Sequence, residues 1–138
     1  MPGAEAEASA ALEANAAFYA ALRAGDLETM DALWARNEVV LCTHPGGPTI
    51  HGRIAIMASW HGIFTHGPPP VEYSDDRVSL IRGVAFVSCV EHIADQQFSA
   101  TNVLVWEDGG WRLVLHSAGA IIDAPERIDS PGASGLLH

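Results

Sequence analysis

The stretch at residues 99–117, SATNVLVWEDGGWRLVLHS, constrains the fold more than any other part of the chain. Apolar and polar residues alternate from Ala100 to Trp106, and the alternation resumes at Trp111. Between them lie Glu, Asp and two Gly residues, which suit the positive φ angles of a tight turn. The stretch therefore predicts a β-hairpin with its turn at Asp108 and Gly109, and with Trp106 opposite Trp111.

Counting back from that turn defines the two faces of the predicted hairpin. One face is apolar apart from a single amide, and it holds the pairs Leu104 with Leu113, Asn102 with Leu115 and Ala100 with Ser117. The other face is more polar, and it holds the pairs Val105 with Arg112, Val103 with Val114 and Thr101 with His116. Asn102 is therefore the polar side chain that we expect to be buried.

Length and charge limit the classes of protein to which this chain can belong. The 138 residues suit one domain, and no apolar run is long enough to span a membrane. A formal net charge of −10 repels phosphate groups, so we expect neither nucleic acid nor a membrane surface as a partner. The first positive charge is Arg23, unlike a secretory signal, and Cys42 and Cys89 suit reduced buried thiols. These features predict a cytoplasmic protein.

The order of patterns along the chain predicts an α+β fold. Helical spacing covers residues 5–24, 26–37 and 54–66, with Gly25 ending the first helix and Asp26 capping the second. A short strand is expected at residues 38–43, followed by a Pro- and Gly-rich loop that begins at His44. Period-two patterns then predict four strands, at residues 71–81, 84–97, 98–106 and 111–121. We expect one domain over residues 1–121 and a loosely held tail over 122–138.

Three short fragments, in this order and spacing, resemble the NTF2-like superfamily, closest to its SnoaL-like and ketosteroid-isomerase-like members. They are the AGDL turn at Ala24, the Pro45, Gly46 and Gly52 loop, and the GGWR segment that begins at Gly109. The resemblance covers about residues 8–121. It implies a cystatin-like cone, in which a curved, mainly antiparallel sheet wraps three N-terminal helices around a deep pocket. It does not fix a reaction, since such folds host several.

Matching residues to the ketosteroid isomerases suggests catalytic candidates. Their catalytic Asp corresponds to His44, their protonated Asp to Asn102, and their Tyr to Phe18. The resemblance thus implies that His44 abstracts a proton and that Asn102 donates to a developing oxyanion. The alternatives are that His44 is a surface turn residue and that Asn102 bonds to the backbone or to Ser117.

A kinase association domain also looks similar, but its pocket arginines fall on Val90, Asn102 and Ala118, which argues against a carboxylate ligand. Glu91 and His92 are adjacent on a strand, so whichever points inward is a pocket candidate. The candidates for lining the pocket are Phe18, Trp34, Trp60, Phe64, His92, Trp106 and Leu115.

A metal site is not expected. His61 and His66 are five residues apart and so do not align on one helix face, and Cys42 and Cys89 are distant in sequence. GxSxG, P-loop and GxGxxG motifs are also absent from the sequence, so it gives no support for acyl hydrolysis, nucleoside triphosphates or dinucleotide cofactors.

Two classes of function remain. The first is a cofactor-free isomerase, cyclase or dehydratase that acts on a small hydrophobic carbonyl compound. The second is a non-catalytic ligand-binding or dimerisation module. In either case we expect a homodimer through the outer sheet face, where Thr101, Val103, Val105 and Val114 leave β-branched surface.

Overall fold

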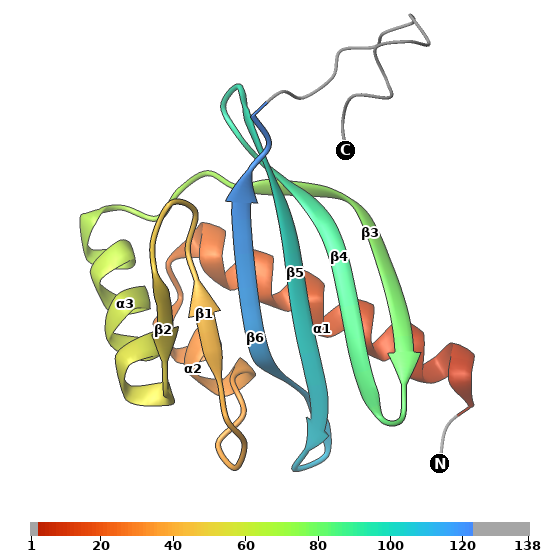
Figure 1. Cartoon of the computed structure of the whole chain (residues 1–138). Coiled ribbons are helices and arrows are strands. Elements are labelled where there is room, and N and C mark those ends of the chain that lie inside the picture. The colour runs from red at the N-terminus through yellow and green to blue at the C-terminus, as the bar shows by residue number, and fades with distance from the viewer. Residues whose placement is uncertain (1–2, 123–138) are drawn as a thin grey trace, which may run out of the picture.

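A computed structural model describes residues 3–122, in which three helices lie on one face of a six-stranded sheet (Figure 1). The helices are α1 (Ala4–Ala24), α2 (Leu27–Leu33) and α3 (Arg53–His66). The strands are β1 (Leu41–Thr43), β2 (Thr49–His51), β3 (Glu72–Ile81), β4 (Val84–Ile93), β5 (Gln96–Glu107) and β6 (Gly110–Ala120). This arrangement confirms the predicted α+β fold class. The tail was expected over residues 122–138, and all of it after residue 122 lies outside the described residues.

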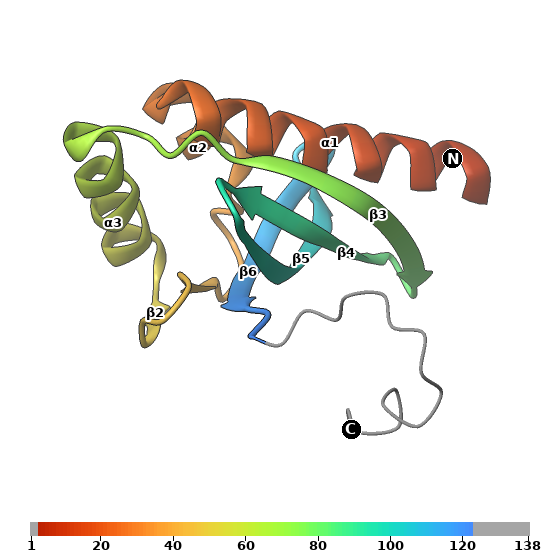
Figure 2. The ribbon, with the colours of Figure 1, turned by 90° about the horizontal axis from the view of Figure 1, so that it is seen from above.

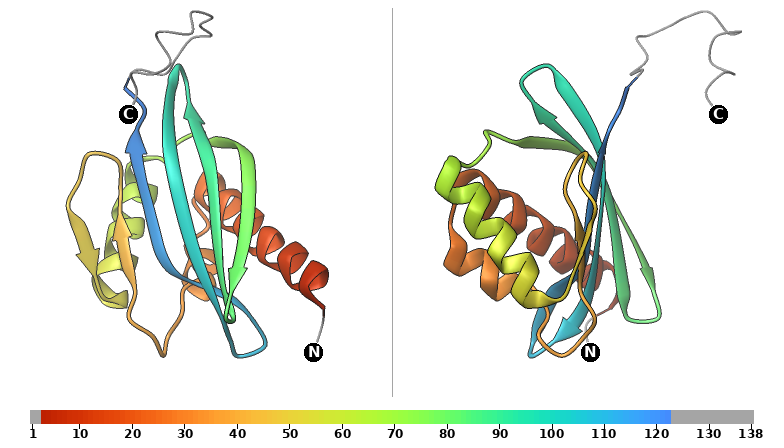
Figure 3. Two further views of the ribbon diagram at one scale, coloured as in Figure 1. Left: turned by 45° about the vertical axis from the view of Figure 1, so that its right-hand side comes forward. Right: turned by 60° about the vertical axis from the view of Figure 1, so that its left-hand side comes forward.

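The sheet has the order β2-β1-β6-β5-β4-β3, and all neighbours are antiparallel except β1 and β6. Because β1 pairs with the last strand, it joins the N-terminal half of the chain to the C-terminal meander. The sheet is strongly twisted, and helix α1 crosses it on the face that also carries α2 and α3 (Figure 2). Seen from the side, the opposite face of the sheet carries no helix formed by residues 3–122 (Figure 3).

Local chemistry explains the α1–α2 hairpin. Gly25 adopts the left-handed conformation (φ 68°), and its N–H donates to the last carbonyls of α1, as the sequence predicted. Asp26 then caps α2 by accepting a hydrogen bond from the Thr29 N–H at 3.1 Å. Helix α2 ends at Leu33, and not near Asn37, because Trp34 turns to extended backbone and bridges to Leu113 on β6.

Two boundaries in the meander differ from the prediction. The turn between β4 and β5 lies at Ala94 and Asp95, whereas the sequence pattern placed it at residues 97–98. Ala94 holds a positive φ of 56°, a conformation that a pattern search expects of Gly or Asn. The expected loop after His44 also contains the short strand β2, which pairs with β1.

The predicted register of the β5–β6 hairpin is correct only near the turn. Trp106 pairs with Trp111 and Leu104 with Leu113, as expected. A bulge between Val103 and Leu104 then shifts the register by one residue, so that Asn102 lies opposite His116 instead of Leu115. His116 is therefore turned to the inner face, and Leu115, paired with Val103, to the outer face.

The core lies between the inner face of the sheet and the helices. It is built from fully buried side chains of α1, α2 and α3 such as Phe18, Met30 and Ile56, together with Val87 and Leu104 of the sheet. The outer face keeps apolar surface, with Phe86 at 40% and Ile81 at 53% exposure. Val103, which was expected to be part of that surface, is only 8% exposed and so contributes little to it.

Candidate functional site

A pocket of about 100 Å³ opens beside the end of β1, between the helices and the sheet. Most of its wall is apolar, and three ionisable side chains interrupt it. Its lining consists of Leu22, His44, Pro45, Trp60, Ile63, Pro69, Val71, Glu91, Ile93 and His116. The polar groups reach this pocket from three different places in the chain, namely the loop after β1, strand β4 and strand β6.

His44 occupies the first position after β1. Its Nε2 lies 2.9 Å from the Ser59 hydroxyl on α3, and its ring packs edge-on against Trp60. The Ser59 hydroxyl donates its proton to the Ile56 carbonyl at 2.8 Å, so His44 donates through Nε2–H and keeps a lone pair on Nδ1. Burial lowers the pKa of His44, which keeps this imidazole neutral near pH 7.

Glu91 is the member of the Glu91 and His92 pair that points inward. Its side chain is buried, and its Oε2 accepts a 2.7 Å hydrogen bond from the Tyr19 hydroxyl of α1. Burial raises the pKa of Glu91, although the Tyr19 hydrogen bond acts in the opposite direction. Burial also raises the pKa of Tyr19, so the phenol remains a proton donor.

His116 is held by a chain of buried amides. Its Nδ1 lies 2.6 Å from Asn102 Oδ1, while Asn102 Nδ2 donates to Asn15 Oδ1 at 2.8 Å and to the Tyr19 oxygen at 3.2 Å. These partners come from α1, β5 and β6, and the bulge in the β5–β6 pairing, where Val114 is the extra residue of β6, brings them together. The network ties His116, through Tyr19, to Glu91.

His116 Nε2 lies 3.9 Å from Glu91 Oε2. At that distance an ionised Glu91 would favour an imidazolium, but both groups are buried and both resist ionisation. Burial, with the nearby His44 as a second cause, lowers the pKa of His116 to about 3. Burial thus favours the neutral form of both side chains.

The two catalytic candidates have different surroundings. His44 lines the pocket, as the loop position suggested, and is not a surface turn residue. Asn102 is fully buried, as expected, but it is not among the lining residues, and Asn15 and Tyr19 take both of its amide hydrogens. An amide with no free hydrogen cannot also donate to an oxyanion, so this arrangement does not fit that role.

Of the seven expected lining residues, Trp60 lines this pocket. Phe18 and Phe64 pack against the Trp60 ring but are not in the wall. The others lie elsewhere: Trp34 beside a second pocket, His92 bonded to Ser74, Trp106 at 55% exposure, and Leu115 on the outer face.

Sequence reasoning did not identify Tyr19 or His116 as site residues. The resemblance pointed to Phe18, yet the neighbouring Tyr19 carries the hydroxyl into the network. The sequence did offer one signal for Tyr19, because it carries a hydroxyl and follows Phe18 directly on the same helix. His116 carried no such signal, because its inward direction depends on the bulge between Val103 and Leu104.

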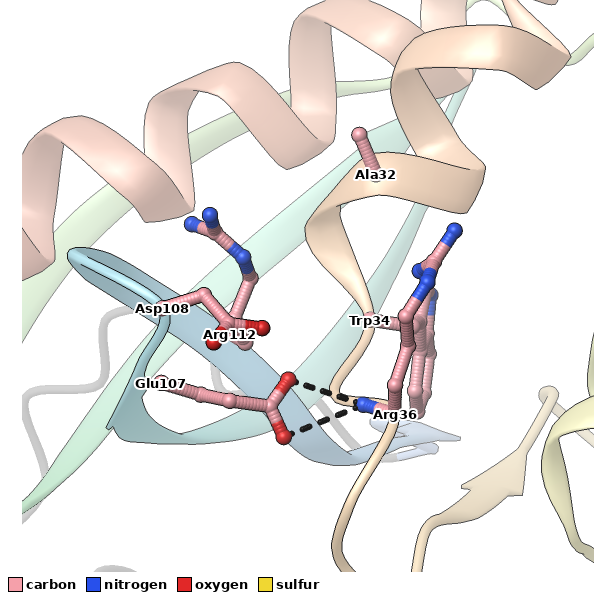
Figure 4. Close-up of a pocket in the computed structure, with 6 residues that line it drawn as sticks. All are labelled: Ala32, Trp34, Arg36, Glu107, Asp108 and Arg112. Carbon is pink, nitrogen blue, oxygen red and sulfur yellow. Dashed lines mark hydrogen bonds between the residues drawn. The ribbon is translucent and has the colours of Figure 1, made fainter.

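A second pocket of about 210 Å³ lies at the tip of the β5–β6 hairpin beside the end of α2 (Figure 4). Glu107 there accepts hydrogen bonds from the backbone N–H groups of Arg36 and Asn37, which fixes the hairpin tip to the loop after α2. Arg36 is paired in turn with Asp31. The charged groups of this pocket thus hold chain segments together, and its lining includes no histidine.

Within residues 3–122, no three His, Cys, Asp or Glu side chains lie close enough together to hold a metal ion. The described helices also include none that is both long and apolar enough to cross a membrane.

Comparison with known proteins places these observations in context. The family model of the SnoaL-like domain matches residues 11–123. A protein of Streptomyces avermitilis, described as a presumed dehydratase of the NTF2-like family, is 30% identical with a TM-score of 0.80, over 86% of this chain and 99% of that one. No curated protein matches.

Two further similar structures carry names from calcium/calmodulin-dependent protein kinase type II. The presumed association domain of a calcium/calmodulin-dependent protein kinase type II from Thiobacillus denitrificans is 34% identical with a TM-score of 0.67, over 78% of this chain and 92% of that one. The CaMKII hub of S. rosetta is 21% identical with a TM-score of 0.66, over 88% of this chain and 100% of that one.

Proposed function

Because the chain belongs to the SnoaL-like family of the NTF2-like superfamily, whose members include isomerases, dehydratases and non-catalytic modules, we propose that its pocket is a proton-transfer site. The proposed activity is that of an isomerase, cyclase or dehydratase acting on a small hydrophobic carbonyl compound. The observation that carries this proposal is the convergence of His44, Glu91 and His116 on one apolar pocket.

His44 is the proposed general base. A base must be unprotonated before it reacts, and burial favours the neutral imidazole of His44. The hydrogen bond to Ser59 fixes the ring and leaves the Nδ1 lone pair to accept a proton. Abstraction of a proton next to a carbonyl yields an enol or enolate, the intermediate common to all three reactions.

Glu91 is the proposed general acid. A carboxyl group whose pKa is raised by burial keeps its proton closer to neutral pH, and Tyr19 holds one of its oxygens in place. Glu91 can then give a proton to the substrate as His44 takes one. The proton count balances without an electron acceptor, so the proposed reaction needs no cofactor.

The pocket also limits the substrate. Its small volume suits a compound of few atoms, and leucine, isoleucine, proline and tryptophan make up much of its wall. The lining contains no Arg or Lys that could pair with an anionic substrate. A neutral carbonyl compound therefore suits the pocket better than a carboxylate.

The second candidate is a non-catalytic ligand-binding or dimerisation module. The observation in its favour is the 34% identity to a presumed kinase association domain. In such a module the same pocket would be occupied, but no proton would be transferred.

Proton exchange separates the two candidates before the natural substrate is known. We would incubate the protein with small ketones and enones in D₂O and follow loss of the α-proton signal by NMR. Replacing a general base typically lowers the rate by about 10²- to 10⁴-fold, so His44→Ala should reduce exchange by about that factor with little change in ligand affinity.

The matched control is His61→Ala, since His61 is exposed on α3 and lies outside the pocket lining. This variant should exchange protons at the wild-type rate. Ligands that bind without any exchange would support the module. Exchange that is equally fast in His44→Ala would refute His44 as the base.

A further inference from the structure

The gap between Glu91 and His116 has the size and chemistry of a site for one oxygen atom. We propose that it is a hydroxyl subsite and that the substrate is a neutral β-hydroxy carbonyl compound, which loses water. This inference rests on the proposed proton-transfer function and narrows it to one reaction and one substrate class.

The hydrogen of the neutral His116 ring lies on Nδ1, and its hydrogen-bond partners show why. The short contact to Glu91 shows that the Tyr19 hydroxyl gives its hydrogen to that carboxyl, so the Tyr19 oxygen accepts from Asn102 Nδ2. The amide is therefore oriented with Oδ1 towards His116, and His116 donates to it from Nδ1–H. In a neutral imidazole the other nitrogen, Nε2, then carries a lone pair.

That lone pair has no hydrogen-bond partner among residues 3–122. The contact from Nε2 to Glu91 Oε2, at 3.9 Å, is too long for a hydrogen bond. Because both residues line the pocket, a ligand oxygen beside this pair of atoms can lie about 2.8 Å from each of them. A hydroxyl there can donate to Nε2 and accept from the Glu91 acid at the same time.

A carbonyl oxygen cannot do both, because it has no hydrogen to give. A ligand that lacks a hydroxyl would leave the Nε2 acceptor in the pocket wall unpaired, which costs binding free energy. The subsite thus selects for a hydroxyl. Water has the same two capabilities, so the empty pocket offers a place for one water molecule that a substrate hydroxyl would replace.

The position of the subsite predicts the reaction. His44 and His116 both line the pocket, and their ring centroids lie 6.5 Å apart, so one small substrate can contact both side chains. His44 takes the proton from the α-carbon, the electron pair forms the C=C bond, and the bond from the β-carbon to oxygen breaks. Glu91 gives its proton to the departing oxygen, which leaves as water. His44 then returns its proton to Glu91 through water after the product has left.

The first test needs no substrate. In ¹⁵N-labelled protein at neutral pH, two-bond ¹H–¹⁵N correlation spectra report which ring nitrogen of each histidine is protonated, and His116→Phe identifies the His116 signals. We expect His116 to carry its proton on Nδ1, and we expect Asn102→Leu to reduce that preference. Val87→Ala is the control, because Val87 is buried opposite Asn102 in the register but takes no part in the network. A proton on Nε2 in the wild type would overturn the proposal.

The second test compares diacetone alcohol, a β-hydroxy ketone, with its methyl ether in NMR titrations. The wild type should bind the alcohol about two- to tenfold more tightly, which is the net contribution of one hydrogen bond. His116→Phe should bind both compounds equally, whereas His61→Phe should keep the wild-type preference. If His116→Phe does not fold, the comparison of the alcohol with its methyl ether in the wild type still tests the proposal. Equal affinities in the wild type, as expected of a gap that holds water only, would overturn the proposal.

The two proposals fail in different ways. A preference for the hydroxyl together with absent proton exchange would overturn the proposed catalytic function and leave the subsite intact. Proton exchange with no preference for the hydroxyl would overturn the subsite alone.

Discussion

Replacing His116 with phenylalanine should remove a large pH dependence from the stability of this protein. The pKa of His116 is about 3 in the folded state, well below the ordinary histidine value of about 6.5 that applies after unfolding. Below about pH 6.5 the unfolded chain therefore binds a proton that the folded chain does not. The stability that depends on a neutral His116 is therefore complete above about pH 6.5, and it is lost progressively as the pH falls towards 3.

The expected change in the free energy of unfolding follows from the binding of one proton to the unfolded chain. Each pH unit in this window changes the free energy of unfolding by about 1.4 kcal/mol, so moving from pH 7 to pH 5 should cost about 2 kcal/mol. That is a large share of the roughly 5–15 kcal/mol that stabilises a typical domain. His116 is fully buried, so solvent does little to reduce the effect.

Other groups titrate in the same pH range. Burial also lowers the pKa of His44, which adds a loss of the same sign, while the raised pKa of Glu91 acts in the opposite sense. Both groups remain in His116→Phe, so the difference between the two pH profiles isolates His116.

The assay is urea unfolding followed by tryptophan fluorescence at several values between pH 7 and pH 5. The wild type should lose about 2 kcal/mol more than His116→Phe over this range, and the exposed-site control His61→Phe should match the wild type. Parallel profiles for wild type and His116→Phe would refute the reasoning. They would mean that the pKa of His116 in the folded protein lies near its ordinary value and is not lowered by burial.

Three further outcomes are expected. Arg53→Met should lower the free energy of unfolding by about 2 kcal/mol in urea titrations, because the guanidinium holds the end of α2 through the carbonyl and carboxylate of Asp31. Gly25→Ala should lower the melting temperature, since its φ is 68° and a Cβ would lie 3.0 Å from the Pro68 ring; an unchanged melting temperature would contradict this. We also propose that the outer sheet face forms a homodimer, so sedimentation at micromolar concentration should give twice the chain mass and Val105→Asp should give a single chain. A wild-type monomer would refute the dimer.

The sequence was sufficient for the parts of the fold that depend on local chemistry. Gly25 and Asp26 placed the turn between the first two helices, because a left-handed residue and a side-chain cap act on their immediate neighbours. Asp108 and Gly109 placed the last turn for the same reason, and the hydrophobic periods supplied the order of helices and strands. The Pro- and Gly-rich composition placed His44 at the start of a loop, and the resemblance to ketosteroid isomerases placed that loop beside a pocket.

The tertiary structure decided which polar side chains meet. Strict alternation showed that Glu91 and His92 point to opposite faces, but only the packing of α1 against β4 shows that Glu91 meets Tyr19. His116 depends on the bulge between Val103 and Leu104, because one extra residue in a strand exchanges the faces of all that follow. A bulge of this kind is fixed by contacts between strands and helices that are distant in sequence, so the site as a whole could not be predicted from local patterns.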